Sequence, residues 1–146
     1  MKQMDAASRL GANAILLIAT LFRRKYCKGD LSEMIRYAHS KNLEVLLETH
    51  TYREFALAAS SEADLIGINN RNLKTLKVDL NVTRKVLKKA KLNSKLVVSE
   101  SGIEKPGDIS FLHRSGAQAF LVGTSVMTAG NIEEKVRELV SSCEDC

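Results

Sequence analysis

The 146-residue sequence is 45% hydrophobic and 27% charged, which is typical of a single globular domain and excludes a disordered chain. Its net charge of +5 comes largely from lysines on the wet face of an expected helix, without interleaved aromatic residues, so we expect no nucleic-acid partner. The sequence contains no apolar run of about eighteen residues and no secretory leader pattern, so we expect no membrane partner and a cytoplasmic location.

Five short apolar segments alternate with helical patterns along the chain. Most are apolar on both faces, as a parallel sheet covered by helices requires. Their spacing is typical of repeated β/α units. The expected strands are Ala14–Ala19, Glu44–Glu48, Leu65–Ile68, Leu96–Ser99 and Ala119–Val122.

Helices are expected wherever apolar residues recur at helical spacing. Asp30 is a suitable N-cap for the first of them, and Pro106 lies where the fourth should begin. Turn residues at 40–42, 93–94 and 115–116 precede three of the strands. The apolar stripes are Leu31, Met34, Ile35 and Ala38; Phe55, Leu57 and Ala58; Val82, Val86 and Leu87; Ile109 and Leu112; and Ile132, Val136, Leu139 and Val140.

The alternation predicts an α/β fold with about five parallel β/α units, which is part of a TIM (β/α)8 barrel and too short for a complete one. We expect one domain over residues 1–146, with residues 142–146 as a frayed tail. Cys27, Cys143 and Cys146 are expected to be reduced thiols. The C-x-x-C spacing of the last two lies in that tail without a nearby histidine, so we expect no metal site there.

Polar residues gather where the expected strands end, which is where parallel β/α folds bind ligands. Glu48 follows four residues of an expected buried strand, where desolvation raises the pKa of a carboxyl and suits it to proton transfer; the alternative is a Glu already in a loop or paired with a lysine. His50 is expected to touch solvent. Asn69 suits a substrate hydroxyl and Arg71 a carboxylate or phosphate, unless they brace a loop.

Two further strand ends carry glycine. Ser101-Gly102 and Gly123-Thr124-Ser125 follow the last two strands, and glycines there let backbone N–H groups approach a phosphate. The alternative is that the glycines only form tight turns. Dinucleotide and P-loop motifs are absent, and no residues have metal-ligand spacing, so we expect a phosphorylated small-molecule substrate and no metal.

The segments LLETH, IGINNRNLKTLKVDL, VVSESGI and AFLVGTSVM resemble the second half of the indole-3-glycerol phosphate synthase family. The resemblance extends from about Asp5 to Val140 and implies strands four to eight of the barrel. It implies a lyase of tryptophan biosynthesis that closes a ring in 1-(2-carboxyphenylamino)-1-deoxyribulose 5-phosphate and then removes carbon dioxide and water. It implies no cofactor.

The resemblance also implies residue roles. Glu48 is the expected general acid/base, and Asn69 would position that carboxylate and a substrate hydroxyl. Arg71 would lie near the carboxylate of the substrate, Glu100 would be a catalytic group, and Leu16 would line the pocket for the aromatic ring. The residues expected at the phosphate are Ser101, which also contacts substrate, Gly102, Gly123 and Thr124.

The family's glutamate and phosphate-binding lysine on strand one, and its lysine general acid on strand three, have no counterpart in this sequence. Lys2 precedes the first strand in a helical region and is not expected to replace that acid, whose loss would cost about 10²–10⁴ in rate. We therefore expect a partner, either an N-terminal half-barrel or a second copy paired through the two open sheet edges. The alternatives are a non-catalytic phosphate-binding half-barrel and a related phosphosugar isomerase or synthase.

Overall fold

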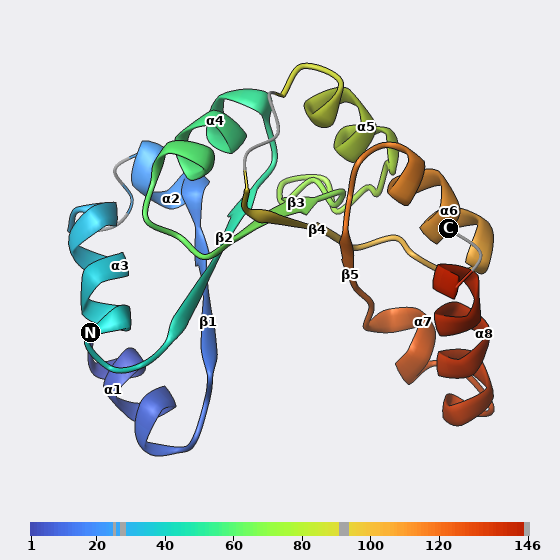
Figure 1. Ribbon diagram of the computed structural model, residues 1–146, viewed down its shortest axis with the longest axis horizontal. Coiled ribbons are helices and arrows are strands. Elements are labelled where there is room, and N and C mark those ends of the chain that lie inside the picture. The colour runs from blue at the N-terminus through green and yellow to red at the C-terminus, as the bar shows by residue number, and fades with distance from the viewer. Residues whose placement is uncertain (25, 27–28, 91–93, 145–146) are drawn as a thin grey trace.

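A parallel five-stranded sheet forms the centre of the structure (Figure 1). The computed structural model describes residues 1–24, 26, 29–90 and 94–144. The strands lie in chain order, so each β/α unit adds its strand to the same growing edge. This confirms the predicted partial-barrel α/β fold. The strands are β1 (Ala14–Ile18), β2 (Glu44–Thr49), β3 (Leu65–Asn69), β4 (Leu96–Glu100) and β5 (Ala119–Leu121).

Helices connect the strands and line the outer side of an arch (Figure 1). Asp30 caps α3 through its carboxylate, which accepts the amides of Ser32 and Glu33, and Pro106 is the first residue of α6, both as predicted. The helices are α1 (Lys2–Arg9), α2 (Ala19–Arg23), α3 (Leu31–His39), α4 (Tyr52–Ser60), α5 (Asn81–Leu87), α6 (Pro106–Arg114), α7 (Thr124–Met127) and α8 (Ile132–Glu144).

All five strands end one residue away from the predicted position: β2, β3 and β4 end one residue later, and β1 and β5 end one residue earlier. Ala19 was expected in the first strand but begins the short helix α2, where Thr20 donates a hydrogen bond to the buried Glu54. Val122 was expected in the last strand, but β5 ends at Leu121 because it pairs with β4 over only three residues.

The two faces of the sheet differ in burial. Leu47, Ile66 and Val97 point outward and are almost completely buried beneath the helices. On the concave face, Leu16 is 41% exposed and Leu121 is 51% exposed. Figure 1 shows no helix covering this face between β1 and β5, so the concave side is left open for a site.

Helix α8 is less buried than its apolar stripe predicts. Leu139 is buried, but Ile132, Val136 and Val140 are 50%, 43% and 55% exposed. The helix packs against α6 and α7, and these neighbours cover only part of its apolar face. Helix α8 also continues through Glu144, into the segment expected to be a tail, whereas residues 145 and 146 lie outside the described residues.

Within the described residues, no helix combines the length and apolar character needed to cross a membrane.

Replacing Leu47 with alanine should destabilise the protein because it leaves a cavity beneath the helices. We expect a loss of about 2–5 kcal/mol in the free energy of unfolding, measured by urea denaturation. Leu16→Ala is the matched control on the open concave face and should cost less than about 1 kcal/mol. Equal losses for the two variants would contradict the assignment of the core to the convex side.

Candidate active site

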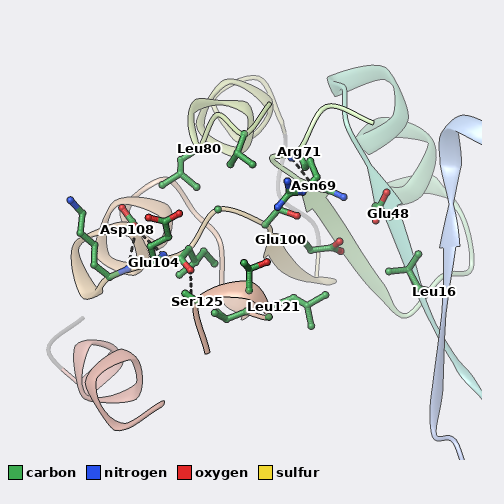
Figure 2. A pocket seen from close by; sticks show the side chains of 18 residues that line it. Leu16, Glu48, Asn69, Arg71, Leu80, Glu100, Glu104, Asp108, Leu121 and Ser125 are labelled. Carbon is green, nitrogen blue, oxygen red and sulfur yellow. Dashed lines mark hydrogen bonds between the residues drawn. The ribbon is translucent and has the colours of Figure 1, made fainter. Parts of the chain in front are cut away.

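A cleft of about 880 Å³ lies at the carboxyl ends of the strands on the concave side. Figure 2 shows side chains from all five strands facing it, from the middle of β1 and from the ends of the other four. The cleft brings together every site residue predicted from the sequence, which are Leu16, Glu48, Asn69, Arg71, Glu100, Ser101, Gly102, Gly123 and Thr124. Their proximity is observed, whereas their roles stay predictions.

Glu48 lies near the end of β2 and is only 6% exposed. Its neighbours across the sheet are Ile18 on β1 and Gly67 on β3. The Oε1 atom is buried and has no hydrogen-bond partner. Both predicted alternatives, a position in a loop and a pairing with a lysine, are wrong: Glu48 belongs to the strand, and among the described residues its ion-pair neighbour is a histidine.

That histidine is His50, which the sequence led us to expect in contact with solvent. Its side chain is only 15% exposed, and its Nε2 lies 3.4 Å from Oε1 of Glu48. Both ring nitrogens are buried without a hydrogen-bond partner. The sequence feature that could have predicted this contact is the two-residue spacing between Glu48 and His50, because side chains two residues apart in an extended segment point to the same side.

Glu100 ends β4 and is 3% exposed. Burial and the neighbouring Glu48 carboxylate raise the pKa of Glu100 to about 8. Its Oε1 is buried and unpartnered, like that of Glu48. The site therefore holds one carboxyl group that retains its proton near neutral pH, which is what proton transfer at that pH requires.

Asn69 is the last residue of β3, Arg71 follows the strand, and both face the same cleft. Oδ1 of Asn69 accepts the backbone N–H of Arg71 at 2.8 Å, so this oxygen braces the turn. The guanidinium of Arg71 donates to the carbonyl of Leu76 at 3.3 Å. Both residues therefore brace this loop, which was the alternative role expected from the sequence, and both also line the cleft.

Ser101 and Gly102 form a left-handed turn after β4, with φ values of 66° and 82°. A Cβ atom on Gly102 would lie 2.2 Å from Cγ1 of Val78, because the β3–α5 loop folds over the turn. Glycine is thus required here by both conformation and space. The turn presents its backbone to the cleft beside Glu100.

The end of β5 supplies the other predicted phosphate loop. Gly123 has φ −125°, and a Cβ atom there would meet nothing within 4 Å, so neither strain nor crowding requires glycine. Thr124 begins the short helix α7, and Ser125 donates to the carbonyl of Ile103 at 2.8 Å. That bond ties the β5 end to the segment after Gly102.

A buried network that the sequence analysis missed holds the β4 turn. Asn70, 1% exposed, donates from Nδ2 to the carbonyls of Glu100 and Ser101 at 3.0 and 3.1 Å. Its Oδ1 accepts the hydroxyl of Thr83 at 2.9 Å, and Thr83 lies 2.9 Å from the hydroxyl of Ser99. Asn70 therefore fixes the backbone that carries Glu100.

Glu54 is the second missed residue, and it holds the β2 end. Its Oε2 accepts the His50 amide at 2.9 Å, and its Oε1 accepts the Thr20 hydroxyl at 2.8 Å. Burial acts to raise the pKa of Glu54, but these hydrogen bonds outweigh it and lower the pKa below its usual value. The Thr51-x-x-Glu54 capping pattern was the available sequence signal.

Among the described residues, no group of three or more His, Cys, Asp or Glu side chains is placed to hold a metal ion. The predictions for the C-x-x-C side chains and for Cys27 fall outside the part of the chain whose side chains the structure describes.

Solved structures share this TIM-barrel-like fold. Thiamine phosphate pyrophosphorylase from Pyrococcus furiosus matches with a TM-score of 0.74 and 20% identity, covering 97% of this chain and 64% of that one. N-acetylmannosamine-6-phosphate 2-epimerase from Clostridium perfringens matches with a TM-score of 0.67 and 16% identity, covering 98% and 61%. At these identities the likeness shows the fold alone.

Sequence comparison then identifies the family. The indole-3-glycerol phosphate synthase family model matches residues 1–139, so the chain belongs to that family. The protein of that name from Methanocaldococcus jannaschii is 44% identical, over 94% of this chain and 49% of its own length. The one from Desulforamulus reducens is 40% identical, over 91% and 49%. This chain thus spans about half the length of these relatives and matches their C-terminal part.

The raised pKa of Glu100 should make stability depend on pH. The folded protein keeps the Glu100 proton up to about pH 8, whereas an unfolded chain releases it near the ordinary value of about 4.3. The free energy of unfolding therefore falls as the pH rises through this interval, by about 1 kcal/mol per pH unit from this group.

Glu100→Gln removes this contribution. Urea unfolding of the variant should show a correspondingly shallower decline between pH 5 and pH 8 than the parent protein. Identical slopes for the two proteins would show that Glu100 titrates normally in the folded state.

Proposed function

We propose that the chain is the C-terminal half of an indole-3-glycerol phosphate synthase, a carboxy-lyase of tryptophan biosynthesis. In this role its cleft takes part in closing the ring of 1-(2-carboxyphenylamino)-1-deoxyribulose 5-phosphate and in removing carbon dioxide and water. The observation that carries the proposal is the pair of buried carboxyl groups of Glu48 and Glu100 beside the Ser101-Gly102 turn. Family membership supports the choice of reaction.

Glu48 is the proposed general acid/base. The geometry supports this role, because the buried carboxyl group lines the cleft and its Oε1 atom has no hydrogen-bond partner in the protein. Glu100 would share in proton transfer, and Asn69 and Arg71 would contact the polar groups of the substrate. Leu16, on the open face of β1, would pack against the aromatic ring.

The proposed phosphate site lies between the ends of β4 and β5. Ser101 and Gly102 approach from one side, and Gly123 and Thr124 from the other. Two neighbouring glycine-containing loops at the ends of the last strands are the recurrent phosphate site of TIM barrels, which supports this assignment.

The proposed partner is an N-terminal half-barrel that supplies the lysines expected from the family. Strands β1 and β5 form the two outer edges of the described sheet, and the concave residues Leu16 and Leu121 are half exposed. Unpaired edge strands that carry exposed apolar side chains support association with further strands. A second copy of this chain would fit the same edges but would bring no lysine from strand one or three.

Mixing the chain with a separately produced N-terminal half should give indole-3-glycerol phosphate formation, followed by the fluorescence of the indole product. Neither half alone should approach that rate, because each lacks general acid/base groups. A non-catalytic half-barrel would bind phosphate without gaining activity from the mixture.

In the complemented enzyme, Glu48→Gln should lower kcat by about 10²–10⁴, because the amide cannot exchange a proton. Glu44→Gln, at the exposed start of the same strand, is the matched control and should leave kcat unchanged. Full activity of Glu48→Gln would remove Glu48 from its proposed role.

Gly102→Ala should weaken binding of phosphorylated ligands, because its Cβ would clash with Val78 and shift the turn. Loss of one charge-assisted hydrogen bond corresponds to about tenfold or more in Kd, measurable by calorimetry with indole-3-glycerol phosphate. Gly130→Ala, whose Cβ would meet nothing within 4 Å, is the control. Unchanged affinity in folded Gly102→Ala would place the phosphate elsewhere.

A further inference from the structure

Gly67 occupies the middle of β3, between the strands that carry the two buried glutamates. It is paired with Glu48 on β2 and with Val98 on β4. A Cβ atom at this position would lie 1.9 Å from Oε1 and 3.0 Å from Cδ of Glu100, and 3.4 Å from Cα of Glu48. Its backbone has no left-handed φ, so space, and not conformation, requires glycine here.

The space above Gly67 is filled by the Glu100 carboxyl group. Glu100 lies two residues beyond Val98 on the same side of β4, and Figure 2 shows its side chain directed across β3 toward Glu48. Any larger residue at position 67 would occupy the space that the Glu100 side chain needs to cross β3. The missing side chain of Gly67 is therefore what lets two carboxyl groups from non-adjacent strands approach each other.

Both carboxyl groups have a buried Oε1 atom without a hydrogen-bond donor. Two facing carboxylate oxygens are both acceptors, and burying them without a donor is unfavourable. A single proton held by one of the carboxyl groups removes one negative charge and supplies the missing donor. Carboxyl pairs in other sites share a proton for the same reason.

The titratable and charged groups around Glu100 do not offer a competing partner. After β2, His50 lies against Glu48, and after β3 the Arg71 guanidinium donates to the carbonyl of Leu76. In the segment after β4, Asp108 accepts the amides of Glu104 and Lys105. Within the described residues, no cation forms a salt bridge with Glu100.

We propose that Gly67 is a positioning residue that admits the Glu100 carboxyl group to Glu48, so that the two groups hold one proton between them in the unliganded protein. The site then contains a proton donor and a proton acceptor side by side at neutral pH. This deepens the proposed function and rests on it for its use in catalysis, but proton sharing itself is a property of this chain alone.

The test is a carboxyl titration of the chain labelled with ¹³C at the glutamate Cδ atoms, followed by NMR from about pH 4 to about pH 10. One resonance should titrate near pH 8, and its loss in Glu100→Gln assigns it. In Gly67→Ala the added methyl group displaces the carboxyl group, and the midpoint should fall by about one unit or more.

Gly107→Ala is the matched control, because its Cβ would lie in open space on the exposed side of α6. Its Glu100 midpoint should equal that of the parent protein. A folded Gly67→Ala protein with an unshifted midpoint would overturn the proposal, as would a Glu100 resonance that titrates at the ordinary value in the parent.

Glu48→Gln provides a second measurement that does not depend on how well Gly67→Ala folds. It keeps the space above Gly67 but removes the neighbouring charge, so the Glu100 midpoint should fall by about one unit or more. An unchanged midpoint would show that no proton is shared. If the titrations behave as expected and the complemented enzyme is inactive, the proposed function fails while the carboxyl pair stands. If the complemented enzyme is active and the Glu100 midpoint is unshifted, the shared proton fails while the proposed function stands.

Discussion

Burial of the outward-facing strand residues beneath the helices is the interaction on which the rest of the structure depends. Leu47, Ile66 and Val97 lose almost all contact with solvent there. Because side chains alternate along a strand, turning Leu47 outward turns Glu48 inward, and turning Ile66 outward places Gly67 in the concave face. A one-residue shift in the register of β2 would bury Glu48 under a helix and expose Leu47 to the cleft. Both changes would be unfavourable in free energy. Hydrophobic burial on one face therefore sets the geometry of the polar site on the other.

Much of the fold and the cleft could be predicted from the sequence because they follow from this alternation. Apolar runs located all five strands, and the shared direction of parallel strands brought Glu48, Asn69 and Glu100 to one edge. Exposure of α8 could not be predicted, since it depends on which elements lie against the helix. The burial of His50 was missed for a similar reason, because its surroundings come from other strands and loops rather than from its own segment.

The two adjacent asparagines show where sequence reasoning stops. Asn69 faces the cleft, whereas Asn70 points to the side of the sheet that packs against the helices, where an unpaired amide would be costly. Its partners, Thr83 and Ser99, lie 13 and 29 residues further along the chain. Nothing local identifies that triad, although strand periodicity places Asn70 on the same side as Ile66 and Ile68. Gly67 is similar: its need for glycine arises from a glutamate 33 residues away that crosses above it.

Charge in the cleft supports the proposal that a partner contributes to phosphate binding. Its lining includes Arg71 and Lys105 as cations, against four carboxyl groups from Glu48, Glu100, Glu104 and Asp108. A phosphate monoester brings about two further negative charges near neutral pH. The proposed shared proton on Glu48 and Glu100 removes one of the four carboxylate charges, and the Asp108 carboxylate accepts backbone amides. The negative charge that remains in the cleft still favours the addition of cations. Asn70 and Glu54 already hold the strand ends in place within this half, so the proposed N-terminal half would contribute lysines to the site and would not need to shape it.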